Sequence, residues 1–309
     1  MLNELYKEKK WYDLCQEIIR VQSEGKPLIS EVMNLVLPNS KQIHPTDYTN
    51  AILSTLPYLD PEAKLSLLSE AQMQLESKSL KQHSREYRLL EIHKQTILMD
   101  VQFQPETIEQ HIFEWQDCQD ECYLQMALKY YEKTENYEEC YNTIIKMKKN
   151  IPLDKFIIYA LLSRKVFNFS NFAFFEGDNK ILFEIVSEFQ EGKMSPLINE
   201  IAILKQHSTF LEQKLNLIRL INLCFNSTRK MLSFSEIEEK LGVDSAIPLL
   251  VQALGLGVVS GVINGEERIF EFTHVIPRVL TKEELIEMKN KFSIWRRKVG
   301  NAIKAIETQ

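Results

Sequence analysis

The chain has 309 residues, of which 44% are apolar and 26% charged, as in a globular protein with a sizeable buried core. Its net charge of −6 argues against a nucleic-acid-binding protein, because such proteins usually carry a basic domain or stripe. Nine glycines are fewer than half of the usual share of roughly 7%, and sheets, hairpins and phosphate-binding loops all use glycine. We therefore expect a mainly helical chain, except near its C-terminus, where five glycines cluster: Gly242, Gly255, Gly257, Gly261 and Gly265.

The cysteines and the first residues indicate a reducing compartment. The five cysteines are odd in number and scattered, unlike the framework of a disulfide-rich secreted domain. The opening sequence MLNELYKEKKWYD is charged and amphipathic and contains no signal-peptide hydrophobic region. We therefore expect a cytoplasmic and nuclear protein.

One uncharged run, residues 246–263, is about long enough to span a bilayer. However, Pro248, Gln252 and three glycines interrupt the run, and a hairpin signal follows it directly. We interpret it as a buried helix that leads into a strand, and we expect no membrane association.

Residues 1 to about 230 have the pattern of helices separated by short breaks. Proline interrupts a helix interior, so the first helices are expected to be short. The prolines of this region are Pro27, Pro38, Pro45, Pro57 and Pro61. A clear helix pair follows at 123–147, where small and aromatic residues recur at helical spacing on both sides of a turn at 134–136. Such pairs bury their apolar faces by stacking on neighbouring pairs, so we predict a helical solenoid of degenerate repeats.

Two features follow the helix pairs. An aromatic cluster is expected to pack in the core, and its members are Val166, Phe167, Phe169, Phe172, Phe174 and Phe175. Apolar spacing then predicts one long helix over 196–225.

From residue 233 onward, the sequence predicts the two helices of a winged-helix domain. Ser233 and Glu236 form a capping box that starts a short helix, and Gly242 ends it. Asp244-Ser245 starts a second helix, which the glycines at 255 and 257 end.

A β-hairpin follows the second helix. Asn264-Gly265 is a strong two-residue hairpin signal, and it separates the apolar strands 258–263 and 268–274. Helix, turn, helix and hairpin in this order predict a winged-helix domain. We expect its strands to offer a sheet edge for lateral association through Val258, Val259, Val262, Ile263, Phe270 and Phe272.

The last helix has a heptad pattern. A capping box at 281–284 opens it, and its apolar residues follow in alternating steps of three and four. These residues are Leu285, Met288, Phe292, Trp295, Val299, Ala302 and Ile306. The helix could dock on its own domain or enter a helical bundle of several subunits, and the strict repeat favours the bundle.

The sequence contains no recognisable catalytic, cofactor-binding or metal-binding motif, and we expect no enzyme activity and no cofactor. It has no phosphate-binding loop, HExxH motif or GxSxG elbow. Cys118 and Cys122 lie one helical turn apart, but no second Cys or His pair lies nearby in the sequence to complete a zinc site. The second winged-helix helix, DSAIPLLVQAL, has one acid and no base, which disfavours binding in a DNA major groove.

Helical repeats that lead into a winged helix and a terminal helix resemble PCI-domain proteins, the scaffold subunits of the proteasome lid, the signalosome and a translation initiation complex. Within that group, the C-terminal part is similar to the proteasome lid family called non-ATPase regulatory subunit thirteen in animals. The resembling segments are Val166-Phe-Asn-Phe169, Leu232-Ser-Phe-Ser-Glu-Ile237, Ala253-Leu-Gly-Leu-Gly257, Val258-Val-Ser-Gly261, Ile276-Pro-Arg-Val-Leu280, Met288-Lys-Asn-Lys-Phe292 and Trp295.

The resemblance implies a solenoid arm over 1–195, a PCI module over 196–280 and a bundle helix over 281–309. It also implies a non-catalytic structural and assembly subunit of the lid that supports ubiquitin-dependent protein degradation. Its partners would be other lid subunits of the PCI and MPN types, with a ubiquitin receptor near the arm, and neither nucleic acid nor membrane. The alternatives are a scaffold subunit of the signalosome or the initiation complex, or a winged-helix protein that binds nucleic acid through basic residues of the last helix.

Overall fold

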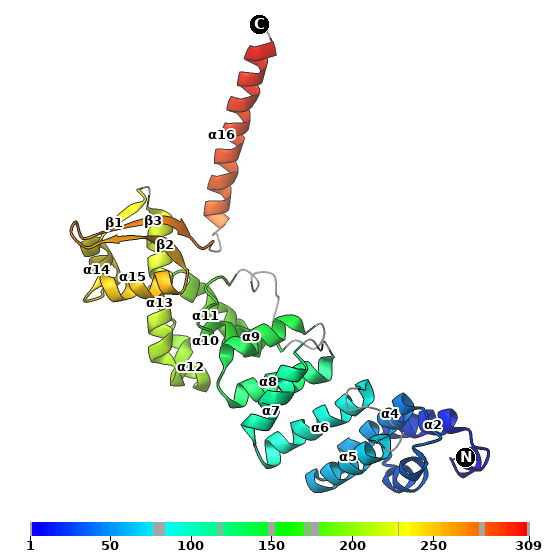
Figure 1. Ribbon diagram of the computed structural model, residues 1–309. Helices are drawn as coiled ribbons and strands as arrows, with labels where there is room; N and C mark the ends of the chain where they lie inside the picture. Colours follow the sequence, from blue (N-terminus) through cyan, green and yellow to red (C-terminus); the bar gives the residue numbers. More distant parts are fainter. Residues whose placement is uncertain are drawn as a thin grey trace. The chain divides into compact units, whose positions relative to one another are not determined.

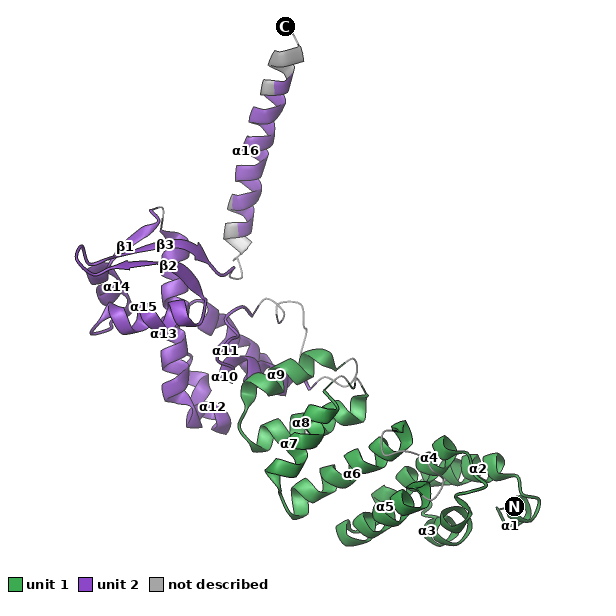
Figure 2. Cartoon of the chain, viewed as in Figure 1, with its two compact units in different colours: residues 1–151 green, residues 152–309 purple. Residues whose placement is uncertain are grey.

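The computed structural model describes residues 2–76, 84–116, 118, 120–147, 152–169, 172, 179–227, 229–277 and 282–307 (Figure 1). The chain divides into two compact units, Met1–Ile151 and Pro152–Gln309 (Figure 2). Among the described helices, none is both long and apolar enough to cross a membrane.

The first unit, where the structure describes it, consists of helices and turns. The α-helices are α1 (Leu2–Lys7), α2 (Trp11–Ser23), α3 (Ile29–Glu31), α4 (Pro45–Thr55), α5 (Pro61–Glu76), α6 (Arg85–Val101), α7 (Pro105–Glu114), α8 (Glu121–Lys133) and α9 (Tyr137–Lys146). A π-helical turn (Val32–Val36) and two 3-10 turns (Leu37–Asn39 and Leu56–Tyr58) lie between them.

Prolines set many of these boundaries, as expected. Pro45, Pro61 and Pro105 each stand at the beginning of a helix, where a backbone N–H has no intrahelical acceptor. Pro38 and Pro57 lie in the two 3-10 turns. Pro45 and the 3-10 turn of Pro57 thus limit α4 to 11 residues, whereas α2, which none of these prolines bounds, has 13.

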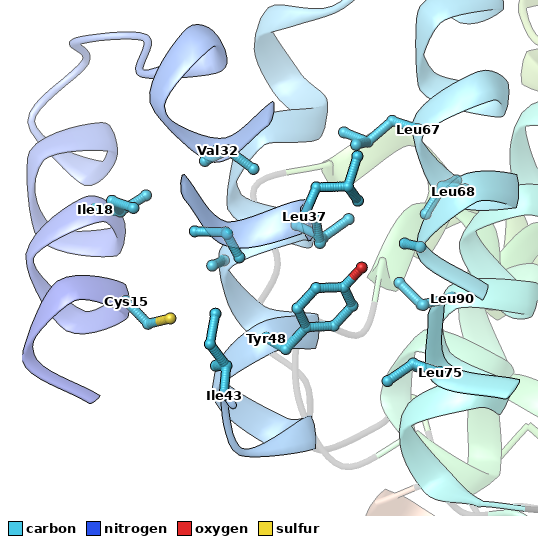
Figure 3. Packing of buried hydrophobic residues seen from close by; sticks show 14 of the residues in the cluster. Cys15, Ile18, Val32, Leu37, Ile43, Tyr48, Leu67, Leu68, Leu75 and Leu90 are labelled. Atoms are coloured by element: carbon cyan, nitrogen blue, oxygen red, sulfur yellow. The ribbon is translucent and has the colours of Figure 1, made fainter. Parts of the chain in front are cut away.

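The core of the first unit joins successive helices (Figure 3). Ile18 of α2, Tyr48 of α4, Leu68 of α5 and Leu90 of α6 are all fully buried. Helix α2 packs on α4, α4 on α5, α5 on α6, α6 on α8, and α8 on α9. Each helix thus buries its apolar face on neighbours in the series, which confirms the prediction of stacked helical repeats.

The helix pair predicted at 123–147 is confirmed as α8 and α9. The turn between them places Glu135 in the left-handed region, at φ 53°. The side-chain oxygen of Asn136 accepts a hydrogen bond from the Glu139 backbone N–H at 3.3 Å and so caps α9.

The second unit contains helices and one small sheet. Its elements are α10 (Leu153–Leu162), α11 (Lys180–Gln190), a 3-10 helix (Pro196–Glu200), α12 (Ala202–Gln206), α13 (Ser208–Asn226), β1 (Met231–Ser233), α14 (Phe234–Leu241), α15 (Ala246–Gly255), β2 (Val259–Asn264), β3 (Ile269–Val275) and α16 (Lys282–Glu307). Both α10 and α11 pack on α13. The predicted division into arm, PCI module and bundle helix stays a prediction.

The prediction of one long helix over 196–225 is wrong. The backbone is extended at Ile201 (φ −104°, ψ 109°) and leaves helical geometry again at His207 (φ −101°, ψ 21°). Three helical segments therefore replace one. Apolar spacing alone missed these breaks because neither residue is a proline or glycine.

The described phenylalanines of the aromatic cluster pack in the core of the second unit, whereas Val166 is partly exposed. The rings of Phe169 and Phe189 are 6.2 Å apart, and those of Phe156 and Phe172 are 4.9 Å apart. Phe169 and Phe172 are at most 2% exposed. Phe174 and Phe175 lie outside the described residues.

A buried lysine joins α13 to the end of α10. Lys214 is 2% exposed, and its Nζ donates hydrogen bonds to the carbonyl oxygens of Ala160 (2.8 Å), Leu161 (2.9 Å) and Ser163 (2.6 Å). Burial lowers the pKa of Lys214 well below its ordinary value. Because the last carbonyls of a helix have no intrahelical donor, this side chain acts as a C-terminal cap for α10.

Candidate interaction surfaces

The two short helices of the winged helix begin and end where their sequence signals predict. Ser233 Oγ accepts from the Glu236 backbone N–H at 3.2 Å, which caps α14. Gly242 ends α14 in the left-handed conformation, at φ 66°. The Glu238 carboxylate accepts from the Ala246 N–H at 3.0 Å and thereby caps α15 from the preceding helix. The helices of the predicted winged helix are thus confirmed.

The hairpin lies at the predicted place, but its turn is different. Asn264 pairs with Ile269, so the loop has the four residues 265–268 rather than Asn264-Gly265 alone. The Asn264 side chain accepts from the N–H groups of Glu266 (3.2 Å) and Glu267 (3.1 Å). Arg268, and not the glycine, adopts the left-handed conformation, at φ 52°. The asparagine therefore organises a longer turn.

The sheet contains a third strand that the sequence did not predict. The strand order is β1-β3-β2, and β1 pairs antiparallel with β3 through Leu232 and Phe270. A strand of three residues is too short to show an alternating pattern. Because β1 covers one side of β3, β3 is the central strand, and β2 and β1 are the edges.

The six residues expected at a sheet edge fall into two groups. Val258, Val259, Phe270 and Phe272 are at most 7% exposed and pack in the core of the winged helix. Phe270 and Phe272 also lie on the central strand and not on an edge. Val262 is 65% exposed on β2, and Ile263 beside it is partly exposed. Among the described strands, none pairs with the outer side of β2, so β2 is the free edge of the hairpin, and Val262 is its most accessible apolar residue.

The uncharged run at 246–263 forms a helix and a strand, but the helix is buried on one face only. Ala246, Leu250 and Ala253 are fully buried, whereas Ile247 and Val251 are 46% and 57% exposed. No residue of α15 is charged. This outer face therefore carries no cation for DNA phosphates, and its exposed polar side chain is that of Gln252.

Helix α16 carries the predicted heptad residues, and the described ones are exposed to solvent. The exposed fractions are 49% for Leu285, 39% for Met288, 61% for Phe292, 64% for Trp295 and 39% for Val299. The side chains of Ala302, Ile306 and residues 282–284 lie outside the described part of the chain, as does residue 281 altogether.

Ile286, Ile294 and Ile303 are further exposed apolar residues of α16, at 60%, 48% and 50%. The heptad count missed them, but at 100° per residue Ile303 adjoins the seam, while Ile286 and Ile294 lie off it. An apolar pattern at all helical positions, not only at heptad steps, would have found them.

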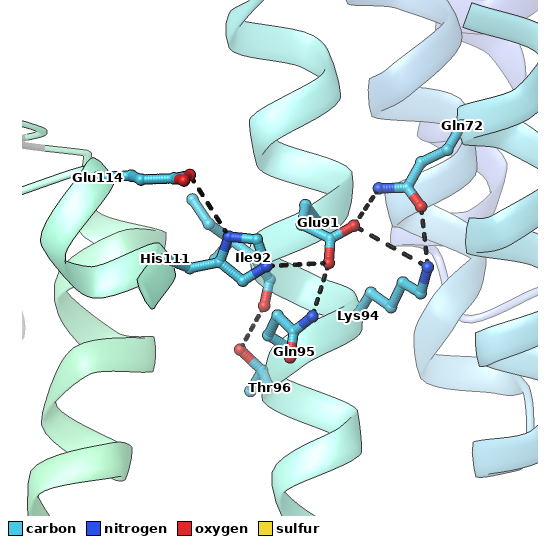
Figure 4. Close-up of polar contacts among 8 residues, drawn as sticks. All are labelled: Gln72, Glu91, Ile92, Lys94, Gln95, Thr96, His111 and Glu114. Carbon is cyan, nitrogen blue, oxygen red and sulfur yellow. Dashed lines mark hydrogen bonds and ion pairs between the residues drawn. The ribbon is translucent and has the colours of Figure 1, made fainter. Parts of the chain in front are cut away.

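Polar side chains gather in the first unit around Glu91, a buried carboxylate on α6 (Figure 4). It accepts hydrogen bonds from Gln72 of α5 (2.5 Å) and Gln95 (2.6 Å), and His111 of α7 lies 3.7 Å away. The one hydroxyl in this group, on Thr96, donates to a backbone carbonyl in its own helix. The group therefore joins the three helices α5, α6 and α7 around one buried carboxylate.

Metal-binding residues do not gather in the described structure. Among the described residues, no group of three or more His, Cys, Asp or Glu side chains could hold a metal ion. Cys118 lies 3.6 Å from an oxygen of Asp120, and Cys122 lies in the first turn of α8.

No protein-family model matches the chain. It is 27% identical over 169 residues to 26S proteasome regulatory subunit RPN9 of Saccharomyces cerevisiae, which covers 49% of this chain and 43% of that protein. It is 28% identical over 124 residues to 26S proteasome non-ATPase regulatory subunit 13 of Dictyostelium discoideum, and this match covers 38% of this chain and 32% of that protein. It is also 24% identical over 214 residues to a probable 26S proteasome regulatory subunit rpn9 of Schizosaccharomyces pombe, and this match covers 60% of this chain and 56% of that protein.

The matched part of the chain spans between 32% and 56% of the length of these relatives. All three are regulatory subunits of the same complex and come from three organisms. The chain is therefore a relative of the 26S proteasome regulatory subunits RPN9 and 13, which confirms the family resemblance seen in its sequence.

Proposed function

We propose that this chain is a non-catalytic structural and assembly subunit of the 26S proteasome lid, in the service of ubiquitin-dependent protein degradation. Its relatives are regulatory subunits, and its described fold combines stacked helices with a winged helix and a terminal helix. The observation that carries the proposal is the solvent exposure of the heptad seam on α16.

The seam of α16 has the properties of a partner-binding helix. Five large apolar side chains of a single stripe are each at least 39% exposed. Burying a side chain of this size stabilises an assembly by about 1.5–3 kcal/mol, so such a stripe favours association. Steps of three and four residues fit packing against other helices in a bundle. At 100° per residue, Lys289 and Arg296 lie on one side of the seam and Lys291 and Lys298 on the other, which favours partner helices with acidic flanks.

The free edge of β2 is the second proposed interface. Unpaired backbone groups along an edge strand can pair with a strand of another protein. Val262, exposed on this strand, would pack against the incoming side chains. We propose that β2 contributes to lateral association with another PCI subunit.

The partners that follow are other lid subunits of the PCI and MPN types, with a ubiquitin receptor near the helical arm, in the cytoplasm and the nucleus. Affinity purification of the tagged chain from its own cells, followed by mass spectrometry, tests this proposal. Recovery of lid and ATPase-ring subunits supports it. Recovery of signalosome or initiation-complex subunits assigns the chain to that scaffold instead, and recovery of chromatin proteins alone contradicts the proposal.

A charge substitution tests the seam itself. Replacing Phe292 and Trp295 with glutamate should leave the chain folded, since both side chains are exposed, but should exclude it from the lid. Asn290→Glu with Ser293→Glu adds the same charge away from the seam and should permit incorporation. Native mass spectrometry of purified lids distinguishes the two variants. Intact lids that contain the Phe292 and Trp295 variant would show that the bundle role is wrong.

A further inference from the structure

Three consecutive helices of the first unit form a groove. Helix α8 lies between α7 and α9 and contacts both, so it forms the floor and they form the walls. The groove has a volume of about 470 Å³, which is in the range of ligand-binding clefts. Most of its buried lining residues are apolar, among them Ile112, Leu124 and Ala127, and Thr143 is a buried polar one.

A large aromatic side chain at the border of this groove is exposed to solvent. Phe113 of α7 lines the groove and is 73% exposed, the highest value among the large apolar side chains that the structure describes. Tyr130 and Tyr131 of α8 also line it, but Tyr130 is buried and Tyr131 is partly exposed, so Phe113 is the exposed aromatic side chain here. Exposed aromatic residues next to an apolar hollow are typical of protein-binding sites, where they become buried on association.

The groove carries negative charge. Glu109 of α7 and Glu139 of α9 both line it. Burial raises the pKa of the Tyr131 hydroxyl, and the nearby Glu139 and Glu109 carboxylates raise it further, so both acids act on the tyrosine side of the groove. One base, Lys146, lines the groove as well.

The surrounding segment strengthens this negative potential. Between Pro105 and Lys146 the sequence has ten acidic residues and three lysines, a balance of −7 where the whole chain has −6. Two of those lysines are held by Asp100 of α6, since Lys129 and Lys133 lie 2.5 Å and 3.6 Å from its carboxylate oxygens. An acidic peptide or a nucleic acid would be repelled here, and a basic peptide attracted.

We propose that this groove binds a short segment of a partner protein in which a large apolar side chain, aromatic or leucine, is flanked by lysine or arginine. The apolar side chain would insert between Phe113 and the buried floor of α8. The flanking cations would reach Glu109 and Glu139, and one could lie over the Tyr131 ring. The proposal is independent of the lid assignment, because it uses no residue of the winged helix or of α16.

Peptide binding to the full-length chain tests the chemistry of the ligand. The probe is a fluorescein-labelled peptide of about twelve residues with one central tryptophan, flanked by lysines and serines. We expect it to bind at least about tenfold more tightly than the same peptide with Trp→Ala or with every Lys→Glu, as measured by fluorescence anisotropy. Equal binding of the three peptides, or no binding of the lysine–tryptophan peptide up to about 1 mM, would overturn the proposal.

Substitutions in the chain test the location. Phe113→Ala, and separately Glu109→Gln with Glu139→Gln, should each weaken binding of the lysine–tryptophan peptide about tenfold. The matched controls outside the groove are Met73→Ala, which removes a side chain 69% exposed on α5, and Glu62→Gln with Glu70→Gln on the same helix. Circular dichroism verifies that each variant folds. Unchanged affinity in the groove variants, or an equal loss in the controls, would place the binding elsewhere and refute the proposal.

Discussion

Replacing Lys214 with methionine keeps the length of the side chain but removes three hydrogen bonds from a charged donor. Each such bond contributes about 1.5–3 kcal/mol, so the carbonyls of Ala160, Leu161 and Ser163 lose roughly 4–9 kcal/mol of interaction. Against this, the variant no longer buries an ammonium group, which in proteins costs several kcal/mol. The three carbonyl acceptors match the three N–H donors of the protonated amine, while burial lowers the pKa of Lys214.

The lost hydrogen bonds outweigh the relieved cost of burying the ammonium group, so we predict that Lys214→Met lowers the free energy of unfolding of the second unit by about 2–4 kcal/mol. Hydrogen exchange in the full-length chain, read at the amides of α10 and α13, separates this unit from the first. Lys205→Met removes an exposed lysine of α12 and should leave the same amides unchanged. If these amides exchanged as slowly in Lys214→Met as in the wild type, or more slowly, the lysine would not stabilise the end of α10.

Three further changes have defined outcomes. Gly261→Ala should separate β2 from β3 and cost at least about 2 kcal/mol in thermal unfolding, because the new Cβ would lie 2.1 Å from the Glu271 carbonyl oxygen; a normal melting curve would refute the close approach. Tyr48→Phe should leave stability unchanged or raise it by up to about 1 kcal/mol in urea unfolding, because the buried hydroxyl has no hydrogen-bond partner among the described residues; a large loss would reveal a partner. Burial raises the pKa of Cys15 from 9.0 to about 12, so its contribution is complete below pH 9 and is lost as the pH rises toward 12. Between pH 8 and 10.5 the wild type should therefore lose about 2 kcal/mol more than Cys15→Ala, and equal losses would contradict the raised pKa.

Local signals in the sequence were sufficient wherever one residue controls its own neighbourhood. Ser233 and Gly242 bound α14 because a cap needs only a side-chain oxygen or a left-handed backbone within one turn. The heptad seam of α16 is equally local, since it follows from the spacing of residues on one helix. Its exposure agrees with a partner-binding role, which stays a proposal.

Features that depend on residues distant in the sequence were decided only by the tertiary structure. Strand β1 exists because its three residues pair with β3, almost forty positions later, and this pairing makes Phe270 central and buried. The spacing of α13 puts Lys214 in line with the apolar residues Leu211, Ile218 and Ile221, but its three carbonyl acceptors lie more than fifty positions earlier and have no signal in the sequence. The groove at Phe113 likewise needs three helices packed side by side. Periodicity reports which face of an element is apolar, and only packing decides what that face meets.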